Sequence, residues 1–94
     1  MSAYLIVNFD ITDADGYREY QGVATPILHG GKLLVLDADS SKVEGEPGHQ
    51  TVVIEYESRE AAEAAYHGAD YQAVIGKRHA ATANRTAVIV DGLG

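Results

Sequence analysis

The fold of this chain is decided by residues Gln50 to Ala80, which read QTVVIEYESREAAEAAYHGADYQAVIGKRHA. A β-branched strand opens the stretch, and Ser58 offers an N-cap for the alanine-rich helix that follows. Gly68 interrupts this helix, and Asp70 begins a second helical segment. The start of the chain shows the same order of strand and helix. Two such halves in one short chain predict a split β-α-β arrangement.

The first half begins with residues Ala3–Ile11, in which apolar residues alternate as in a strand. A helix is predicted to follow from an N-cap at Thr12 or Asp13 and to end at the glycine pair 30–31. Pro26 removes one backbone donor within this helix and is expected to kink it.

Two further strands are predicted, one on each side of the deciding stretch. Residues Lys32–Asp37 (KLLVLD) form one, and residues Thr86–Asp91 (TAVIVD) form the other. The polar residues Ala38–His49, with two glycines and a proline, indicate a hairpin loop before the strand at Thr51–Glu57. The order is that of an α+β, ferredoxin-like βαββαβ fold with a four-stranded antiparallel sheet, built as a single domain over residues 1–94.

The strands are apolar on both faces, whereas the helices of this fold cover only one. The simplest cover for the second face is another copy of the chain, so we expect a homodimer. Val7 and Val53 are candidates for the face between the two sheets. The pattern alone does not tell which alternate residues face the helices.

Charge and composition exclude several classes of partner. The chain has a formal net charge of -7, and its basic residues are scattered apart from Lys77-Arg78. Nucleic acid and anionic membrane surfaces are therefore not expected as partners. There is no cysteine, no apolar run of membrane-spanning length and no signal-peptide pattern at the start, so we expect a cytoplasmic protein without a thiolate metal site.

The chain resembles the small bacterial proteins of the domain of unknown function 1330 family. The resemblance rests on AYLIVNFDITD, YREY, GGK, VEGE, the block VVIEYESREAAEAAYHGADYQAVIGKRHAA and the terminal AVIVDG. That family belongs to the dimeric α+β barrel superfamily, which also holds antibiotic-biosynthesis-type monooxygenases. The resemblance implies a homodimer whose two sheets face each other as a barrel. It implies no catalytic mechanism and no cofactor.

Tyrosine is the residue type that points most clearly to a ligand site. The chain has six tyrosines, one phenylalanine and no tryptophan. A tyrosine gives a pocket both apolar area and a hydroxyl that orients a polar ligand, although each one can equally lie at the edge of the core. Tyr17 and Tyr20 are expected on the first helix, and Tyr71 on the last helical segment.

A few polar residues interrupt otherwise apolar elements. Glu55 lies in the middle of a strand. Arg78 could pair with it across the gap between sheet and helix, and the alternative is a solvated Glu55 at the rim of a dimer. His79 shares a helical face with Tyr71, and a solvated histidine is the alternative. Splayed helices leave space above the sheet of such a fold, so we expect a candidate small-molecule site there. Its predicted lining is Asn8, Tyr17, Tyr20, Glu55, Tyr71, Arg78 and His79.

No metal or cofactor site is predicted. The four histidines, His29, His49, His67 and His79, have no i, i+4 spacing among them. The acidic residues of the hairpin lack the register of a calcium loop, and no phosphate-binding glycine motif occurs. Three functions remain open: an enzyme acting on a small organic molecule, a binding or sensing dimer, and a structural module whose barrel is only a dimer core.

Overall fold

The computed structural model of the protein describes residues 1–28 and 30–93, and at positions 26 and 27 it describes the backbone alone. The elements follow the predicted order. They are β1 (Ala3–Ile11), α1 (Ala14–Ile27), β2 (Lys32–Asp37), β3 (Gln50–Tyr56), α2 (Arg59–His67), α3 (Ala69–Ala81) and β4 (Thr82–Asp91). The strands form one antiparallel sheet in the order β2-β3-β1-β4. This is the ferredoxin-like topology, and the predicted fold class is confirmed.

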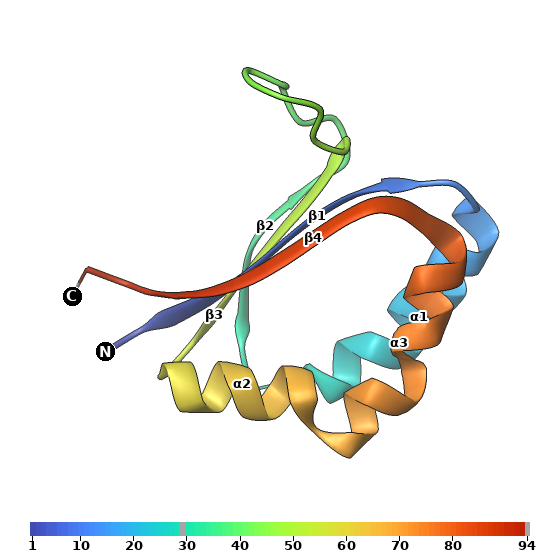
Figure 1. The fold of residues 1–94 in the computed structure, drawn as a ribbon. Helices are drawn as coiled ribbons and strands as arrows, with labels where there is room; N and C mark the ends of the chain where they lie inside the picture. Colours follow the sequence, from blue (N-terminus) through green and yellow to red (C-terminus); the bar gives the residue numbers. More distant parts are fainter. Residues whose placement is uncertain (29, 94) are drawn as a thin grey trace.

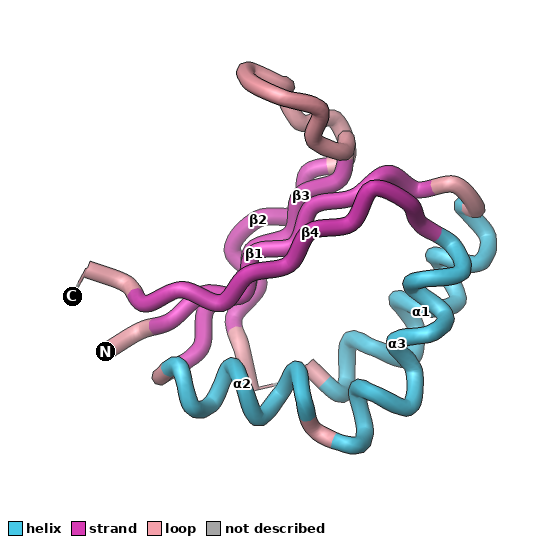
Figure 2. Tube along the Cα trace, in the orientation of Figure 1, coloured by secondary structure: helices cyan, strands magenta, loops and turns pink. Residues whose placement is uncertain are grey.

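All three helices lie on one side of the sheet (Figure 1). The connection between β2 and β3 projects away from the rest of the molecule, beyond the sheet (Figure 2). The two ends of the chain lie together, because β1 and β4 are neighbours and the Gly92 N–H donates to the Ser2 carbonyl at 2.7 Å. No helix among the described residues is long and apolar enough to cross a membrane.

Local sequence signals explain where the helices begin and end. The Ser58 side chain accepts a hydrogen bond from the Ala61 N–H at 3.1 Å, as an N-cap does. Asp13 caps α1 in the same way through the Gly16 N–H, also at 3.1 Å. Gly68 adopts an extended conformation between α2 and α3, and a Cβ there would lie 2.7 Å from the Ala64 carbonyl oxygen. A residue with a Cβ at this position would therefore require the backbone at the end of α2 to shift.

Strand register settles which residues face the helices. Leu5, Val7 and Phe9 of β1 are buried beneath the helices, together with Ile54 and Tyr56 of β3. Val7 is therefore wrong as a candidate for the face between two sheets. Leucine and valine both fit either face of a strand, so the apolar pattern could not have decided this.

The opposite side of the sheet, here called the open face, carries a row of four apolar residues. Ile6 lies directly opposite Val53 and Val88, and Val53 lies opposite Val35. The row thus crosses all four strands, and at its ends Val35 and Val88 are 40% and 51% exposed. The expectation that both faces of the sheet are apolar is confirmed.

β4 differs most from its predicted bounds, since it begins at Thr82 rather than Thr86. Its first residues pair with the end of β1, where Ile11 lies opposite Thr82. The register shifts between Asn8 and Asp10, and Asn84 has a positive φ of 56°, as in a β-bulge. The polar stretch TANR shows no apolar alternation, so this part of the strand left no signal in the pattern.

Candidate functional site

Arg78 is the most unusual side chain on the helix side of the sheet. It lies on α3 two turns after Tyr71, so both residues face the sheet, and it is only 3% exposed. Its guanidinium carbon lies 5.8 Å from the centre of the Phe9 ring. Nη2 donates to the Tyr66 hydroxyl at 3.4 Å, whereas Nε and Nη1 are buried without a hydrogen-bond partner among the described residues. A guanidinium buried in this way is costly unless something pairs with it.

No acidic side chain neutralises this charge among the described residues. The ion pairs that arginine forms there are Arg18–Asp15 and Arg59–Asp91, both at the surface. The predicted pairing of Arg78 with Glu55 is wrong. Glu55 lies on the open face, opposite Tyr4, whose hydroxyl donates to it at 3.2 Å. The sheet itself therefore separates the two groups.

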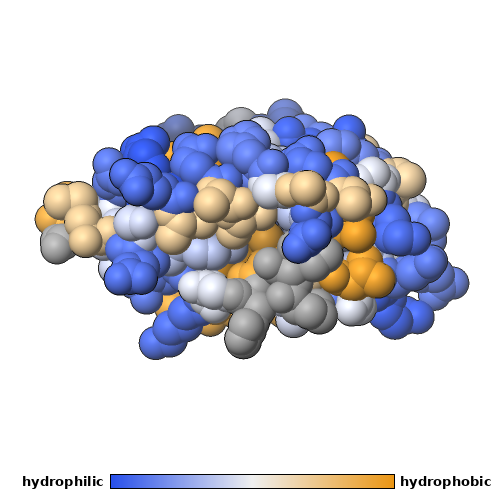
Figure 3. All heavy atoms as spheres, turned by 90° about the horizontal axis from the view of Figure 1, so that it is seen from below, coloured by the Kyte–Doolittle hydropathy of each residue, from blue (hydrophilic) through white to orange (hydrophobic). Residues whose placement is uncertain are grey.

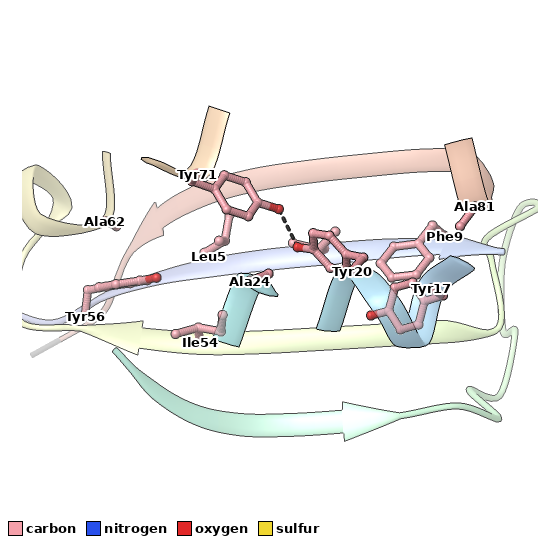
Figure 4. Close-up of a cluster of buried hydrophobic side chains, with 11 residues drawn as sticks. Leu5, Phe9, Tyr17, Tyr20, Ala24, Ile54, Tyr56, Ala62, Tyr71 and Ala81 are labelled. Atoms are coloured by element: carbon pink, nitrogen blue, oxygen red, sulfur yellow. Dashed lines mark hydrogen bonds between the residues drawn. The ribbon is translucent and has the colours of Figure 1, made fainter. Parts of the chain in front are cut away.

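Three tyrosines surround the space in front of Arg78. Tyr17 and Tyr20 come from α1 and Tyr71 from α3, and all three are buried. The hydroxyls of Tyr20 and Tyr71 lie 2.6 Å apart and share a hydrogen bond, which Figure 4 shows above the sheet. The rings of Tyr17 and Tyr20 are 5.5 Å apart between centroids, and Tyr17 contacts Phe9 in the same manner at 5.4 Å. An aromatic wall thus runs from β1 to both long helices.

Burial raises the pKa of two of these phenols, Tyr17 and Tyr20. It raises the pKa of Tyr20 strongly, and the hydrogen bond with Tyr71 raises it further. Burial also raises the pKa of Tyr17, and the positive charge of Arg78 opposes the shift in both residues. Both phenols consequently keep their protons at neutral pH. They can donate hydrogen bonds to a ligand, but they do not serve as general bases.

The side chains of this cluster enclose an inner cavity of about 30 Å³. It is lined by Leu5, Val7, Phe9, Tyr17, Tyr20, Leu28, Val52, Ile54, Tyr71 and Arg78. An outer groove of about 230 Å³ between α1 and the β2–β3 edge shares four of these residues, Tyr17, Tyr20, Leu28 and Ile54. The rest of the groove is lined by Gln21, Ala24, Thr25, Gly31, Leu33 and Leu36. The outer groove and the inner cavity therefore share a wall. The face seen from below in Figure 3 carries apolar residues between hydrophilic ones.

Two further polar groups near this cluster were not predicted. Within the part of the chain that the structure describes, the Tyr56 hydroxyl and the Gln50 side-chain oxygen Oε1 are buried without a hydrogen-bond partner. Figure 4 shows the Tyr56 hydroxyl pointing along the sheet toward Ile54 and Leu5, which line the inner cavity. Gln50 lies opposite Phe9 on the same face. A glutamine at the first position of a strand carries no sequence signal of its own, so only the register could reveal it.

Of the seven predicted lining residues, four come together and three do not. Tyr17, Tyr20, Tyr71 and Arg78 line the inner cavity. Asn8 lies on the open face, where its amide bonds the Gly48 backbone and the Thr51 hydroxyl. Asn8 and Glu55 therefore both lie outside the pocket, because alternate residues of a strand point to opposite faces of the sheet.

His79 is exposed on α3 and does not line the cavity. One residue along a helix is a rotation of about 100°, so the side chain next to a buried Arg78 turns toward solvent. Partial desolvation and then the charges of Arg78 and Arg85 lower the pKa of His79. The shift makes the ring neutral at physiological pH, but it faces no part of the cavity.

The other histidines lie elsewhere. Nδ1 of His49 is 3.0 Å from Asp10 Oδ1, and its Nε2 accepts from the Ile11 N–H, which fastens the hairpin to β1. His67 pairs with Glu63 at 3.1 Å on the surface of α2. His29 lies outside the described residues. Within the described part of the chain, no cluster of three or more histidine, aspartate or glutamate side chains is placed to hold a metal ion.

A second groove, of about 220 Å³, lies between α2 and β4 and is lined by Leu5, Glu63, Tyr66, His67 and residues 87–89. Its acidic and basic side chains pair with each other at the surface. Among the described residues, the buried polar atoms that lack a partner belong to Gln50, Tyr56 and Arg78, and none of these residues lines it. The Arg78 cluster is therefore the stronger candidate site.

The solved structures that resemble this one share its fold at low sequence identity. A protein of unknown function from Rhodopseudomonas palustris has a TM-score of 0.79 at 16% identity, over 99% of this chain and 83% of that one. A dabb family protein with a ferredoxin-like fold from Mesorhizobium loti has a TM-score of 0.70 at 15% identity, over 99% and 98%. A dimeric ferredoxin-like protein of unknown function from Thermobifida fusca has a TM-score of 0.68 at 18% identity, over 98% and 92%.

At such low sequence identity, the similarity to these structures shows a common fold and says nothing about activity. No curated protein sequence matches the chain. The sequence profile of the domain of unknown function 1330 family does match it, over residues 2–93. Because that match spans nearly the whole chain, the protein belongs to the domain of unknown function 1330 family.

Proposed function

We propose that the protein binds a small organic molecule between its sheet and its helices, with the body of the molecule in the outer groove and one end in the inner cavity. The observation that carries this is the cavity wall of Tyr17, Tyr20 and Tyr71 with a buried, incompletely bonded Arg78 beside it. Apolar walls with a few convergent polar groups are the usual makeup of small-ligand sites. The groove, at about 230 Å³, favours a ligand of metabolite size.

The protonation states of the lining residues favour binding over acid–base catalysis. General acid–base catalysis works best with a group whose pKa lies near the operating pH. The phenols of Tyr17 and Tyr20 are shifted away from that range by burial. His79, whose pKa is lowered, faces away from the cavity. A binding or sensing role needs no change in the protonation state of these groups.

The same proposal includes a homodimer formed through the open face, with residues 1–94 acting as one domain in each subunit. The apolar row of Val35, Val53, Ile6 and Val88 supports it, because a row of apolar residues that is at least partly exposed on all four strands indicates a partner surface. The similar Thermobifida fusca protein is described as dimeric. In such a dimer both binding sites remain on the outer, helix-bearing sides.

A second candidate is a structural or interaction module without a ligand. The observation in its favour is the small inner cavity, at about 30 Å³, since side chains nearly fill the core. In that case Arg78 only packs against Phe9 and bonds Tyr66. The two candidates differ in whether anything enters the outer groove.

A fragment screen on ¹⁵N-labelled protein separates them. Small aromatic and aliphatic compounds, neutral and charged, are added and amide shifts are mapped on the structure. The proposal predicts perturbations that cluster at Tyr20, Ala24 and Ile54. Thr25→Trp fills the groove from an exposed position and should abolish them, whereas Val23→Trp, exposed on the same helix outside the groove, should not. Perturbations confined to the α2–β4 groove, or none at all, would refute the proposal.

A further inference from the structure

We propose that the ligand of this pocket is an anion, a small aromatic or alkyl carboxylate, whose carboxylate group pairs with Arg78 in the inner cavity. This inference rests on the proposed binding function and names the chemical class that the site selects. Nothing in the fold or in the similar structures assigns it. It follows from the unused donors of one buried side chain.

The guanidinium has a complete bidentate edge to offer. It carries five N–H donors, arranged so that Nη2 places one hydrogen on each edge of the planar fork. The Tyr66 hydroxyl is the partner of Nη2, and it occupies one of these two hydrogens. Nε and Nη1, which complete the two edges, have no hydrogen-bond partner in residues 1–28 and 30–93 as described. Whichever edge Tyr66 uses, the other remains free for two parallel hydrogen bonds to a carboxylate.

The charge of the pocket is of one sign. Arg78 is the one charged side chain among the described residues that line the inner cavity and the outer groove. The chain as a whole is acidic, with a formal net charge of -7. Surface charges are screened over about 8 Å at physiological ionic strength, whereas a buried charge in contact with the ligand is screened much less. The local cation therefore decides which ligands the pocket prefers.

Size and hydrogen bonding agree with a carboxylate at the inner end. A cavity needs about 10–15 Å³ to hold one water-sized atom, so a volume of about 30 Å³ accommodates roughly the two oxygens of one carboxylate. The paired hydroxyls of Tyr20 and Tyr71 carry two protons, and their mutual bond uses one. The second proton is free to be donated to a carboxylate oxygen.

The outer groove determines which shape and polarity the rest of the ligand can have. Its walls are Leu28, Leu33, Leu36 and Ile54 beside the ring of Tyr20. Gly31 lets the backbone at one end of the groove approach β3 closely, because a Cβ there would collide with Ile54 Cγ2 and lie 2.9 Å from the Tyr56 ring. A flat or extended apolar body fits this slot, and a second charged group has no partner in it.

Matched pairs of acid and amide test the inference. Benzoate and benzamide, phenylacetate and phenylacetamide, and hexanoate and hexanamide are titrated into ¹⁵N-labelled protein at constant ionic strength. A hydrogen-bonded charge pair predicts that the wild type binds each acid about 10- to 100-fold more tightly than its amide. In Arg78→Met this ratio should fall to about one, chiefly through loss of affinity for the acid, since methionine keeps much of the apolar volume but offers no donor. Arg18→Met, which alters an exposed arginine on α1, should keep the wild-type ratio.

Each outcome decides something. Equal affinity of the wild type for acids and amides would overturn the anion assignment and leave the binding function standing. A preference for acids that survives in Arg78→Met would overturn the role of Arg78. Failure of every acid and every amide to bind would refute the binding function itself. The comparison within the wild type needs no variant, so it remains decisive if Arg78→Met does not fold.

Discussion

The hydroxyls of Tyr20 and Tyr71 lie 2.6 Å apart and join α1 to α3 through residues 51 positions apart in the chain. Both phenols are buried, so neither hydroxyl can exchange this partner for bulk water. The pair fixes the spacing of the two helices above the inner cavity. It also keeps two polar groups satisfied while the cavity is empty, and it leaves one proton available to a ligand.

Removing either tyrosine hydroxyl should leave the other without its hydrogen-bond partner. We expect Tyr20→Phe and Tyr71→Phe each to lower the free energy of unfolding by about 1–2 kcal/mol, because a buried hydroxyl loses its partner. The double variant should lose clearly less than the sum of the two single losses. Urea unfolding of all four proteins gives the coupling directly. Strict additivity would show that the 2.6 Å contact contributes nothing to stability.

Arg78 should destabilise the empty protein. Replacing a buried and poorly paired guanidinium by methionine should raise the free energy of unfolding by about 1–3 kcal/mol. Arg18→Met, at an exposed position, should change it by less than about 0.5 kcal/mol. Chemical unfolding without ligand measures both. A loss of stability in Arg78→Met would mean that the contacts with Phe9 and Tyr66 outweigh desolvation, which would favour the structural module.

The open face should hold the dimer together. An aspartate at Val53, in the middle of the apolar row, would be an unpaired charge inside the interface, so Val53→Asp should give a folded monomer. Val7→Asp places the charge beneath the helices and should unfold the chain. Val43→Asp, in the hairpin at a position 89% exposed, serves as the control and should stay dimeric. Light scattering at micromolar concentration reports the masses, and a monomeric wild type would end this part of the account.

Acid should loosen the junction between the hairpin and β1. A backbone hydrogen bond from His49 is the main cause that lowers the pKa of Asp10, with smaller contributions from the His49 ring, Asn84 and Lys42. A carboxyl whose folded pKa is lowered stabilises the fold above its unfolded pKa, about 3.9, and loses that contribution as the pH falls further.

In Asp10→Asn the free energy of unfolding should therefore depend less on pH in the acidic range. Between about pH 6 and about pH 3 the wild type should lose more stability than the variant does. Asp15→Asn changes an exposed carboxylate on α1 and controls for the loss of one charge. Urea unfolding at several pH values is the measurement. Parallel profiles for the wild type and Asp10→Asn would show that the contact with His49 is not linked to protonation.

The sequence alone was enough for the order of the elements. Alternation in β1, the cap at Ser58 and the break at Gly68 are local signals, and the structure follows each of them. The start of β4 was missed because Thr82 to Arg85 are mostly polar, and Thr82 and Ala83 are held in the sheet by pairing with β1, which is a contact distant in sequence. The local alternation of apolar residues cannot predict a strand that forms only because a neighbouring strand pairs with it.

The residues of the candidate site were predicted correctly only on the helices, where the spacing of residues determines which side chains share a face. Tyr17 and Tyr20 share one face of α1, and Tyr71 and Arg78 share one face of α3, so their convergence could be inferred. Asn8 and Glu55 failed because a strand gives two equivalent faces, and the apolar pattern here was alike on both. That Arg78 has no acidic partner among the described residues is a property of the assembled core and has no sequence signature.

The Arg78 side chain offers the most direct measurement of the central claim, that an incompletely bonded guanidinium faces a ligand space. The Nε–H resonance of Arg78 can be followed in ¹H–¹⁵N spectra while phenylacetate is added. The account predicts a saturable shift of this resonance, together with amide shifts around the outer groove, and no such shift with phenylacetamide. An unchanged Nε–H signal at phenylacetate concentrations that saturate shifts elsewhere would contradict the account.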